Sequence, residues 1–217
     1  STLRAANLVV VLMYAALFSM FFFVTLYLQQ VLGDDALQAG LSFLPTTLAV
    51  FTASSTAPRL VAQLGVRRVV TIGMLFASAG LLILTGVSPG GSYCTVVLPG
   101  GVLAGLGMGL GLVPSTIAAT HGVPRTQSGL ASGLLNTSRL VGGALGLAVL
   151  STIAASSTGH AVGVSSAQAL TNGFALAFQI GAGITIVAAV VAAVMLRPPE
   201  ARHDEVVVAE ESEALAA

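Results

Sequence analysis

The sequence predicts an all-α integral membrane protein with six helices that cross a bilayer. Of its 217 residues, 55% are hydrophobic and only 7% are charged, and the mean hydropathy is +0.96. In soluble domains about a quarter of the residues are charged. The apolar residues also form stretches long enough to span a hydrocarbon core of about 30 Å, which takes roughly 20 residues of helix. This composition excludes a water-soluble fold.

Six spans are expected, each bounded by glycine, proline, serine or charged residues, which mark the points where a helix leaves the membrane. Six crossings place both termini on one side of the bilayer. We expect residues 1–198 to form one transmembrane transport domain and 199–217 an acidic, disordered cytoplasmic tail. The expected spans are 7–32, 36–58, 69–88, 95–120, 129–156 and 172–196.

Arginines predict the orientation, because cytoplasmic loops are enriched in Arg and Lys. The chain has no lysine, and the opposite connections carry only Asp34, Asp35 and His160. We therefore expect a multi-pass protein of the plasma membrane with both termini in the cytoplasm. The arginines at the N-terminus, in or just after the second and fourth connections, and in the tail are Arg4, Arg59, Arg67, Arg68, Arg125, Arg139, Arg197 and Arg202.

The first span carries an aromatic face that becomes polar toward its outer end. Such a face suits a cavity for bulky amphipathic compounds, since aromatic walls accept many shapes and a few polar groups orient the ligand. The alternative is an interfacial belt of aromatic residues facing lipid. Phe21 and Phe23, on other faces, are expected to face lipid. The face consists of Tyr14, Phe18, Phe22, Thr25 and Gln29.

The fourth and fifth spans are rich in glycine. Small residues four positions apart lie on one helix face and let a neighbouring backbone approach closely. These glycines either pack helices or allow them to bend during alternating access; both interpretations stay open. The residues concerned are Gly101, Gly105 and Gly109 in the fourth span, and Gly129, Gly133, Gly142 and Gly146 in the fifth.

Arg139 lies alone inside the fifth span. A charge within a membrane is costly and marks either a function or a partner. Asn136, three residues earlier, lies on the same helix face. We expect it to line the substrate cavity and to form, with Arg139, a polar contact at the inner gate. The alternative is that the Arg139 side chain reaches back to the inner membrane surface.

Several kinds of binding and catalytic group are absent from the sequence, and this limits the chemistry that the chain could perform. The net charge of zero gives no basic surface for nucleic acid, and no nucleotide-binding loop is present. No cofactor or metal is expected, because His121, His160 and His203 are far apart. No nucleophile and base are grouped, so an enzyme is not expected. None of the predicted spans contains Asp or Glu, the groups that carry coupled protons in many carriers.

Three stretches resemble the major facilitator superfamily, and specifically its fourteen-helix drug:proton antiporter family. They are residues 28–33 (LQQVLG), residues 37–45 (LQAGLSFLP) and residues 129–143 (GLASGLLNTSRLVGG). The resemblance implies that the chain is the C-terminal six-helix half of a two-bundle carrier, with an N-terminal half preceding it. That half would also supply the coupling carboxylate.

The connection between the second and third spans resembles the C-terminal copy of the family's cytoplasmic loop motif. Gly65, Arg67 and Arg68 match the motif, whereas Ala62 stands where the motif has an acidic residue and Pro58 replaces its first glycine. The charge contacts that latch the cytoplasmic side in the N-terminal copy are therefore not expected at this connection.

We therefore expect a secondary transporter that exports hydrophobic or cationic small molecules, such as drugs or antibiotics, in exchange for protons. Its partners would be the lipid bilayer, the cargo, protons and the N-terminal half. One alternative is a facilitator for another small metabolite, although the spans offer few polar groups to bind one. Another is a non-transporting membrane subunit or a gene relic.

Overall fold

The computed structural model describes residues 2–120, 125–160 and 163–196, so the tail 199–217, His121 and His203 lie outside the described residues. The described ranges are almost entirely helical. Two short π-helical segments, η1 (Tyr27–Val31) and η2 (Tyr93–Val97), and a 3-10 turn, η3 (Arg125–Gln127), adjoin the α-helices. The α-helices are α1 (Thr2–Leu26), α2 (Ala36–Ser42), α3 (Leu44–Leu64), α4 (Val66–Leu84), α5 (Leu98–Thr120), α6 (Ser128–Gly159) and α7 (Ser166–Met195).

Six helical segments among the described residues are long and apolar enough to cross a membrane, which confirms the predicted all-α class and the number of spans. α1 with η1, α2 with α3, and η2 with α5 each make one span. The segments are Arg4–Val31, Ala36–Leu64, Val66–Leu84, Tyr93–Ala119, Ser128–Gly159 and Ser166–Met195.

Several helices differ from their predicted bounds: α1 begins at Thr2 instead of 7, α4 covers Val66–Leu84 instead of 69–88, and α6 ends at Gly159 instead of 156. The two largest extensions are those of α3 and α7. The second span was expected to end at Pro58, but α3 continues to Leu64, because proline removes only one backbone donor and residues 59–64 include several strong helix formers. The connection to α4 is then reduced to Gly65, whose φ of 80° suits glycine. α7 begins at Ser166 instead of 172, because the Ser165 hydroxyl caps it by accepting a hydrogen bond from the Gln168 amide.

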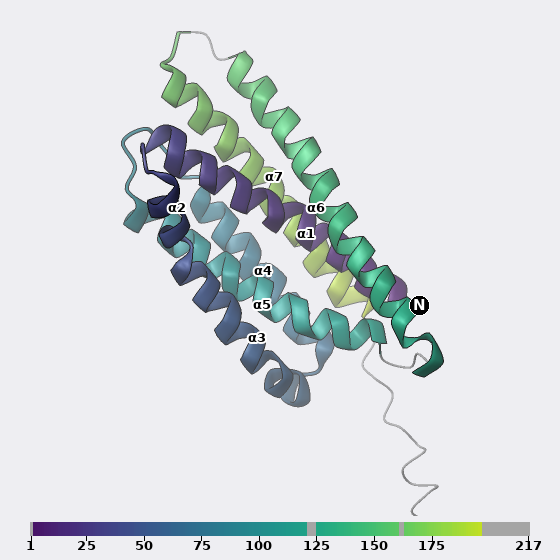
Figure 1. Ribbon diagram of the computed structural model, residues 1–217. Coiled ribbons are helices and arrows are strands. Elements are labelled where there is room, and N and C mark those ends of the chain that lie inside the picture. The colour runs from purple at the N-terminus through teal and green to yellow at the C-terminus, as the bar shows by residue number, and fades with distance from the viewer. Residues whose placement is uncertain (1, 121–124, 161–162, 197–217) are drawn as a thin grey trace, which may run out of the picture.

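The helices form two layers (Figure 1). α3 and α6 lie on opposite sides of the front layer with α1 and α5 between them, and α4 and α7 lie behind. α1 packs against α6 and α7, and α5 packs against α3 and α4. The two groups of three spans, α1 to α4 and α5 to α7, thus make matching contacts, in the way that internal repeats of transporters do.

Two pairs of parallel helices pack through small residues. Gly142 and Gly146 of α6 lie against the backbones of Val11 and Ala15 of α1, and the two series advance together in steps of four residues. In the same way, Gly105 and Gly109 of α5 lie against α3, where an added Cβ would be 2.7 Å from the Thr46 carbonyl oxygen and 2.6 Å from the Val50 carbonyl oxygen, respectively. Close backbone approach of this kind stabilises helix pairs in lipid.

α5 also packs closely on α4, which runs antiparallel to it. A Cβ added at Gly107 would meet the Ala77 backbone nitrogen and lie 2.5 Å from the Gly73 carbonyl oxygen, and one added at Gly80 would lie 2.5 Å from the Gly100 carbonyl oxygen. α5 is therefore enclosed by backbone contacts on two sides.

Candidate functional site

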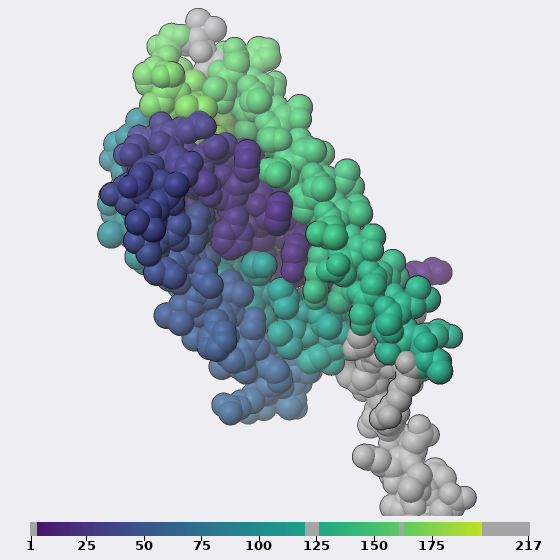
Figure 2. All heavy atoms as spheres, in the orientation of Figure 1, coloured from purple at the N-terminus to yellow at the C-terminus, as the bar shows by residue number. Residues whose placement is uncertain are grey.

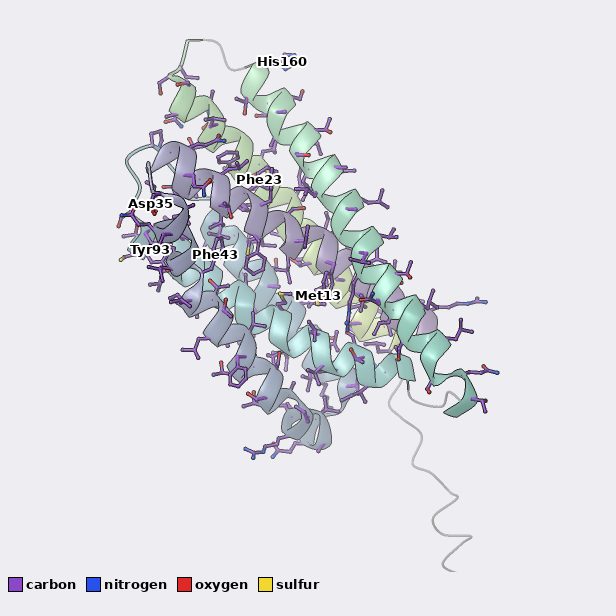
Figure 3. All side chains as sticks on the ribbon, in the orientation of Figure 1. Met13, Phe23, Asp35, Phe43, Tyr93 and His160 are labelled. Carbon is purple, nitrogen blue, oxygen red and sulfur yellow. The ribbon has the colours of Figure 1, made fainter. Side chains whose placement is uncertain are left out.

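A pocket of about 260 Å³ lies between α1 and α5, on the face of the bundle that α3 and α6 flank. Figure 2 shows this face, with the α1 surface between α3 and α6, and Figure 3 labels Met13 near the middle of it. The volume is slightly below the usual range for small-molecule pockets, which is roughly 300–1,000 Å³. The lining residues are Met13, Tyr14, Leu17, Phe18, Phe21 and Met108.

Two of the five predicted cavity residues line this pocket, and Phe22, Gln29 and Asn136 do not. Tyr14 and Phe18 are lining residues. Phe22 is exposed at 40% and its ring packs edge-on against Phe23. The predicted cavity face of α1 followed Tyr14, Phe18 and Phe22. The observed pocket also includes the neighbouring face with Met13, Leu17 and Phe21, which lies about 100° around the helix.

The expectation that Phe21 and Phe23 face lipid was wrong for Phe23. Its side chain is only 2% exposed and packs on Phe174 and Phe178 of α7, with ring centroids 5.6 and 6.2 Å away. Phe21 is half-buried, lines the pocket, and has its ring centroid 5.4 Å from that of Phe43. Aromatic pairs at these spacings are favourable, so both rings stabilise helix contacts within the bundle.

Gln29 lies away from the pocket. It is exposed on η1, at the end of α1 that precedes Asp34 and Asp35. Nearby, the Tyr27 hydroxyl donates a hydrogen bond of 3.0 Å to the Ser88 carbonyl, and the Tyr93 hydroxyl donates one of 2.7 Å to the Ser42 carbonyl. These two bonds tie the connections together at this end of the bundle.

Arg139 of α6 points into the bundle. Its Nη2 donates a hydrogen bond of 2.8 Å to Thr116 Oγ1 of α5, and its guanidinium carbon lies 5.9 Å from the centre of the Tyr14 ring of α1. Thr116 in turn donates to the Leu112 carbonyl at 2.9 Å. The Nε of Arg139 is buried and has no hydrogen-bond partner in the described part of the chain. Arg139 therefore connects three helices beside the pocket.

Asn136 is exposed one turn before Arg139 and does not bond to it. It lies seven residues before Gly143, so the two share a helix face, and a Cβ added at Gly143 would be 3.3 Å from the Phe18 ring. Asn136 thus lies on the strip of α6 that faces the pocket side of α1.

The glycines expected to pack helices fall into two groups. Gly105, Gly109, Gly142 and Gly146 lie against neighbouring backbones, as described above. Gly129 and Gly133 have nothing within 4 Å of an added Cβ, so they make no such contact within the described residues. In the register set by Gly142 with Val11 and Gly146 with Ala15, these two positions lie level with or beyond Thr2, the first residue of α1.

The residues of the cytoplasmic loop motif lie where α3 meets α4. Gly65 forms the turn between the helices with a φ of 80°, and Arg67 and Arg68 are exposed in the first turn of α4. Ala62 is exposed on α3 and offers no group that could pair with these arginines.

Acidic and metal-binding groups are few in the described ranges. Asp34 and Asp35 are the only carboxylates there. The Asp35 side chain caps α2 by accepting a hydrogen bond of 2.7 Å from the backbone N–H of Gln38. No group of three or more His, Cys, Asp or Glu side chains that could hold a metal ion occurs among residues 2–120, 125–160 and 163–196.

Several site residues were missed from sequence, namely Met13, Leu17, Met108 and Thr116. Met13, Leu17 and Phe21 recur every four residues, as residues on one helix face do. Tyr14, Phe18 and Phe22 recur in the same way, so the spacing alone could not decide between the two faces. Met108 and Thr116 lie among the glycines of α5, and no periodicity separates them from other apolar or hydroxyl residues there. Thr116 lies near Arg139 only because α5 and α6 both pack on α1.

Comparison with known proteins identifies related sequences. Residues 8–216 match the sequence profile of the Major Facilitator Superfamily. The puromycin resistance protein pur8 of Streptomyces alboniger is 33% identical over 207 residues, which are 91% of this chain and 41% of that protein. The lincomycin resistance protein of Streptomyces lincolnensis is 34% identical over 193 residues, 89% of this chain and 38% of that protein.

A third relative carries a name that describes transport. The cephamycin export protein CmcT of Amycolatopsis lactamdurans is 37% identical over 153 residues, which are 70% of this chain and 32% of that protein. The chain thus spans about two-fifths or less of the length of these relatives.

Proposed function

The chain belongs to the major facilitator superfamily, and we propose that it forms the C-terminal six-helix half of a secondary transporter that exports hydrophobic or cationic small molecules in exchange for protons. The observation that carries this proposal is the apolar, aromatic pocket between α1 and α5. Its walls of Phe, Tyr and Met accept varied ligand shapes. The relatives named for antibiotic resistance or export support the same class of cargo.

The partner of this half is an N-terminal six-helix bundle. Both helices that flank the pocket leave large apolar side chains exposed: Leu48 and Phe51 of α3 are 63% and 68% exposed, and Leu130 and Leu140 of α6 are 76% and 67% exposed. Some of these faces contact lipid and some contact the other half, which would close the pocket from the front. A carrier with this arrangement alternates access by rocking one bundle against the other.

Proton coupling in this scheme depends on the other half. A group that binds and releases a proton in the pathway is commonly a carboxylate, and the carboxylates of the described residues, Asp34 and Asp35, lie at one end of the bundle. We therefore assign the coupling acid to the N-terminal half.

The individual roles follow the geometry. Tyr14 and Phe18 bind the apolar part of the cargo, Asn136 and Arg139 form the polar boundary of the pocket on α6, and Gly142 and Gly146 form the contact on which α6 moves. Gln29 and Phe22 contact cargo only on its way out. The carrier lies in the plasma membrane with both termini in the cytoplasm, as the arginine distribution favours, and it performs no enzymatic reaction.

The test is a flux assay in proteoliposomes containing the complete carrier, meaning this chain joined to its N-terminal half. An imposed pH gradient should drive movement of a fluorescent hydrophobic cation, and a protonophore should abolish it. Movement that occurs equally with and without the gradient would contradict proton exchange while keeping transport. No movement of any hydrophobic compound would contradict the proposed function.

A further inference from the structure

Arg139 lies deep enough to be a charge within the membrane. α6 has 32 residues, or about 48 Å of helix, so a hydrocarbon core of about 30 Å centred on it leaves about 9 Å of helix at each end. Arg139 lies eleven residues after Ser128, about 16 Å along the helix. Its backbone is thus inside the core, and its side chain turns inward to Thr116 and Tyr14.

The charge of this guanidinium is not balanced by the described residues. Its one hydrogen bond there goes to a neutral hydroxyl, and its buried Nε has no partner. The described carboxylates, Asp34 and Asp35, lie at the far end of the neighbouring span. An unpaired charge in a low-dielectric site is unfavourable unless an opposite charge joins it, so the site lacks an anion.

The pocket leads to this site. Tyr14 lines the pocket and also stacks near the guanidinium, which lies 5.9 Å from its ring centre. On α5, Met108 lines the pocket and Thr116 holds Arg139; eight residues of helix separate them by about 12 Å. A ligand with an apolar body and one polar end could therefore occupy both places at once.

We propose that Arg139 binds the acidic group of an amphipathic cargo, a carboxylate above all, whose aromatic body occupies the pocket beside Met13 and Met108. This inference rests on the proposed function and narrows it. The planar guanidinium matches a carboxylate with paired hydrogen bonds, and the exposed Asn136 amide adds a donor on the same side of α6. The Tyr14 ring and Thr116 hold the guanidinium in place.

The cargo range changes accordingly. A cation in the pocket would be repelled by Arg139, with little screening in a site shielded from water. This half therefore favours acids and neutral compounds, and any recognition of cations belongs to the other half. A carboxylate could also reach Arg139 from a side chain of that half, so the test must separate the two sources.

The experiment uses photolabelling of the complete carrier in membranes with a matched pair of probes, benzophenone-4-carboxylate and its methyl ester. Labelled peptides containing Met13 or Met108 are quantified by mass spectrometry in the wild type, Arg139→Gln, Arg139→Lys and Arg59→Gln. The last variant removes an exposed charge from α3, so it changes the net charge by the same amount away from the pocket.

We expect the acid to label these peptides in the wild type and Arg139→Gln to reduce that labelling roughly tenfold or more, because a hydrogen-bonded charge is lost. Ester labelling should be unchanged, Arg139→Lys should keep part of the acid labelling, and Arg59→Gln should keep all of it.

Three outcomes would overturn the inference. Unchanged acid labelling in Arg139→Gln would show that Arg139 does not bind the acidic group of the cargo. Loss of ester labelling together with acid labelling in both Arg139 variants would give Arg139 only a structural role. If neither probe labelled the wild type, the pocket itself, and with it the proposed function, would fail; the first two outcomes leave the proposed function intact.

Discussion

The two glycine-rich helices of the front layer, α5 and α6, are held very differently. α5 lies against backbone on two sides, with Gly105 and Gly109 on α3 and Gly107 on α4. α6 lies against the backbone of α1 at Gly142 and Gly146, and its Ala154 backbone lies against Gly173 of α7. Its first two turns carry Gly129 and Gly133, which lie level with or beyond Thr2, the first residue of α1, and have nothing within 4 Å of an added Cβ. Similar glycine spacing thus gives α5 backbone contacts along most of its length, whereas the first turns of α6 make no such contact within the described residues.

This difference divides the bundle into a rigid part and an adjustable part. α3, α4 and α5 are joined through backbone contacts that cannot shift without moving all three helices, because interiors at this density do not deform smoothly. α6 packs on α1 through Gly142 and Gly146 and on α7 through Ala154, and its packing involves fewer glycine-to-backbone contacts than that of α5. The side chains that we propose for the polar boundary of the site, Asn136 and Arg139, lie on α6 at the border between its free and its packed parts.

The largest expected effect comes from Gly107→Ala. The added Cβ would meet the Ala77 backbone and lie 2.5 Å from the Gly73 carbonyl oxygen, and α5 cannot move away because α3 holds its other side. Overpacking of this kind costs about 3 kcal/mol at the upper end of its range. The thermal stability of the purified carrier in detergent should fall sharply, as followed by size-exclusion chromatography after heating.

Gly133→Ala is the matched control for this change, since it adds the same methyl group to the free part of α6. Its stability should be unchanged or slightly raised, because alanine favours helix over glycine by up to about 1 kcal/mol. Equal losses in the two variants would show that α5 and α6 are held alike.

A smaller loss is expected for Gly146→Ala. The new Cβ would meet the Ala15 backbone, but α6 meets neighbouring backbones at fewer glycine positions than α5 does and can therefore shift more readily. We expect a loss of about 1 to 2 kcal/mol in unfolding free energy, with transport reduced more than stability. Flux and thermal stability measured on the same preparations test this, and a stability loss as large as that of Gly107→Ala would contradict it.

Thr116→Val tests the hydrogen bond that joins the two helices. Removing the hydroxyl leaves Arg139 Nη2 without its 2.8 Å acceptor, and hydrogen bonds to charged groups contribute about 1.5–3 kcal/mol. We expect a loss near 1.5 kcal/mol, because the guanidinium can turn toward water or cargo. Thr137→Val, whose hydroxyl is exposed and bonds only to the Gly133 carbonyl among the described residues, should change stability by much less.

The smallest effect concerns cargo binding on α1. Phe18→Ala removes an aromatic wall of the pocket and should lower the export rate at limiting cargo roughly tenfold, since an aromatic contact contributes up to about 1.5 kcal/mol. Phe22→Ala removes a ring of the same size, one turn away and outside the pocket. Export assays in cells expressing the carrier compare the two variants. Equal losses of export would show that the face of α1 with Tyr14, Phe18 and Phe22 binds the cargo.

The number of spans and the helical class could be predicted because they depend on the length and polarity of each segment, which the bilayer fixes. The position of Arg139 in the fifth span also followed directly, since one charge in an apolar stretch is conspicuous.

The orientation of each helix could not be predicted in the same way. Inside lipid, apolar side chains suit both the membrane and the bundle interior, so Phe22 and Phe23 looked alike in sequence although one is exposed and the other packs on Phe174 and Phe178. The partner of Arg139 was hidden for a related reason: Thr116 lies on another helix and bonds to it only through the packing of three helices.

Distance measurements between spin labels test the division into rigid and adjustable parts most directly. In the complete carrier with Cys94 replaced by serine and no other cysteines, labels at Gln63 of α3 and Ser132 of α6 report on the adjustable part. Labels at Gln63 and Ile83 of α4 report on the rigid part, and all three positions are exposed. Adding cargo or changing pH should shift or broaden the first distance and leave the second fixed. If both distances stayed fixed while transport proceeded, or both moved together, the account would be contradicted.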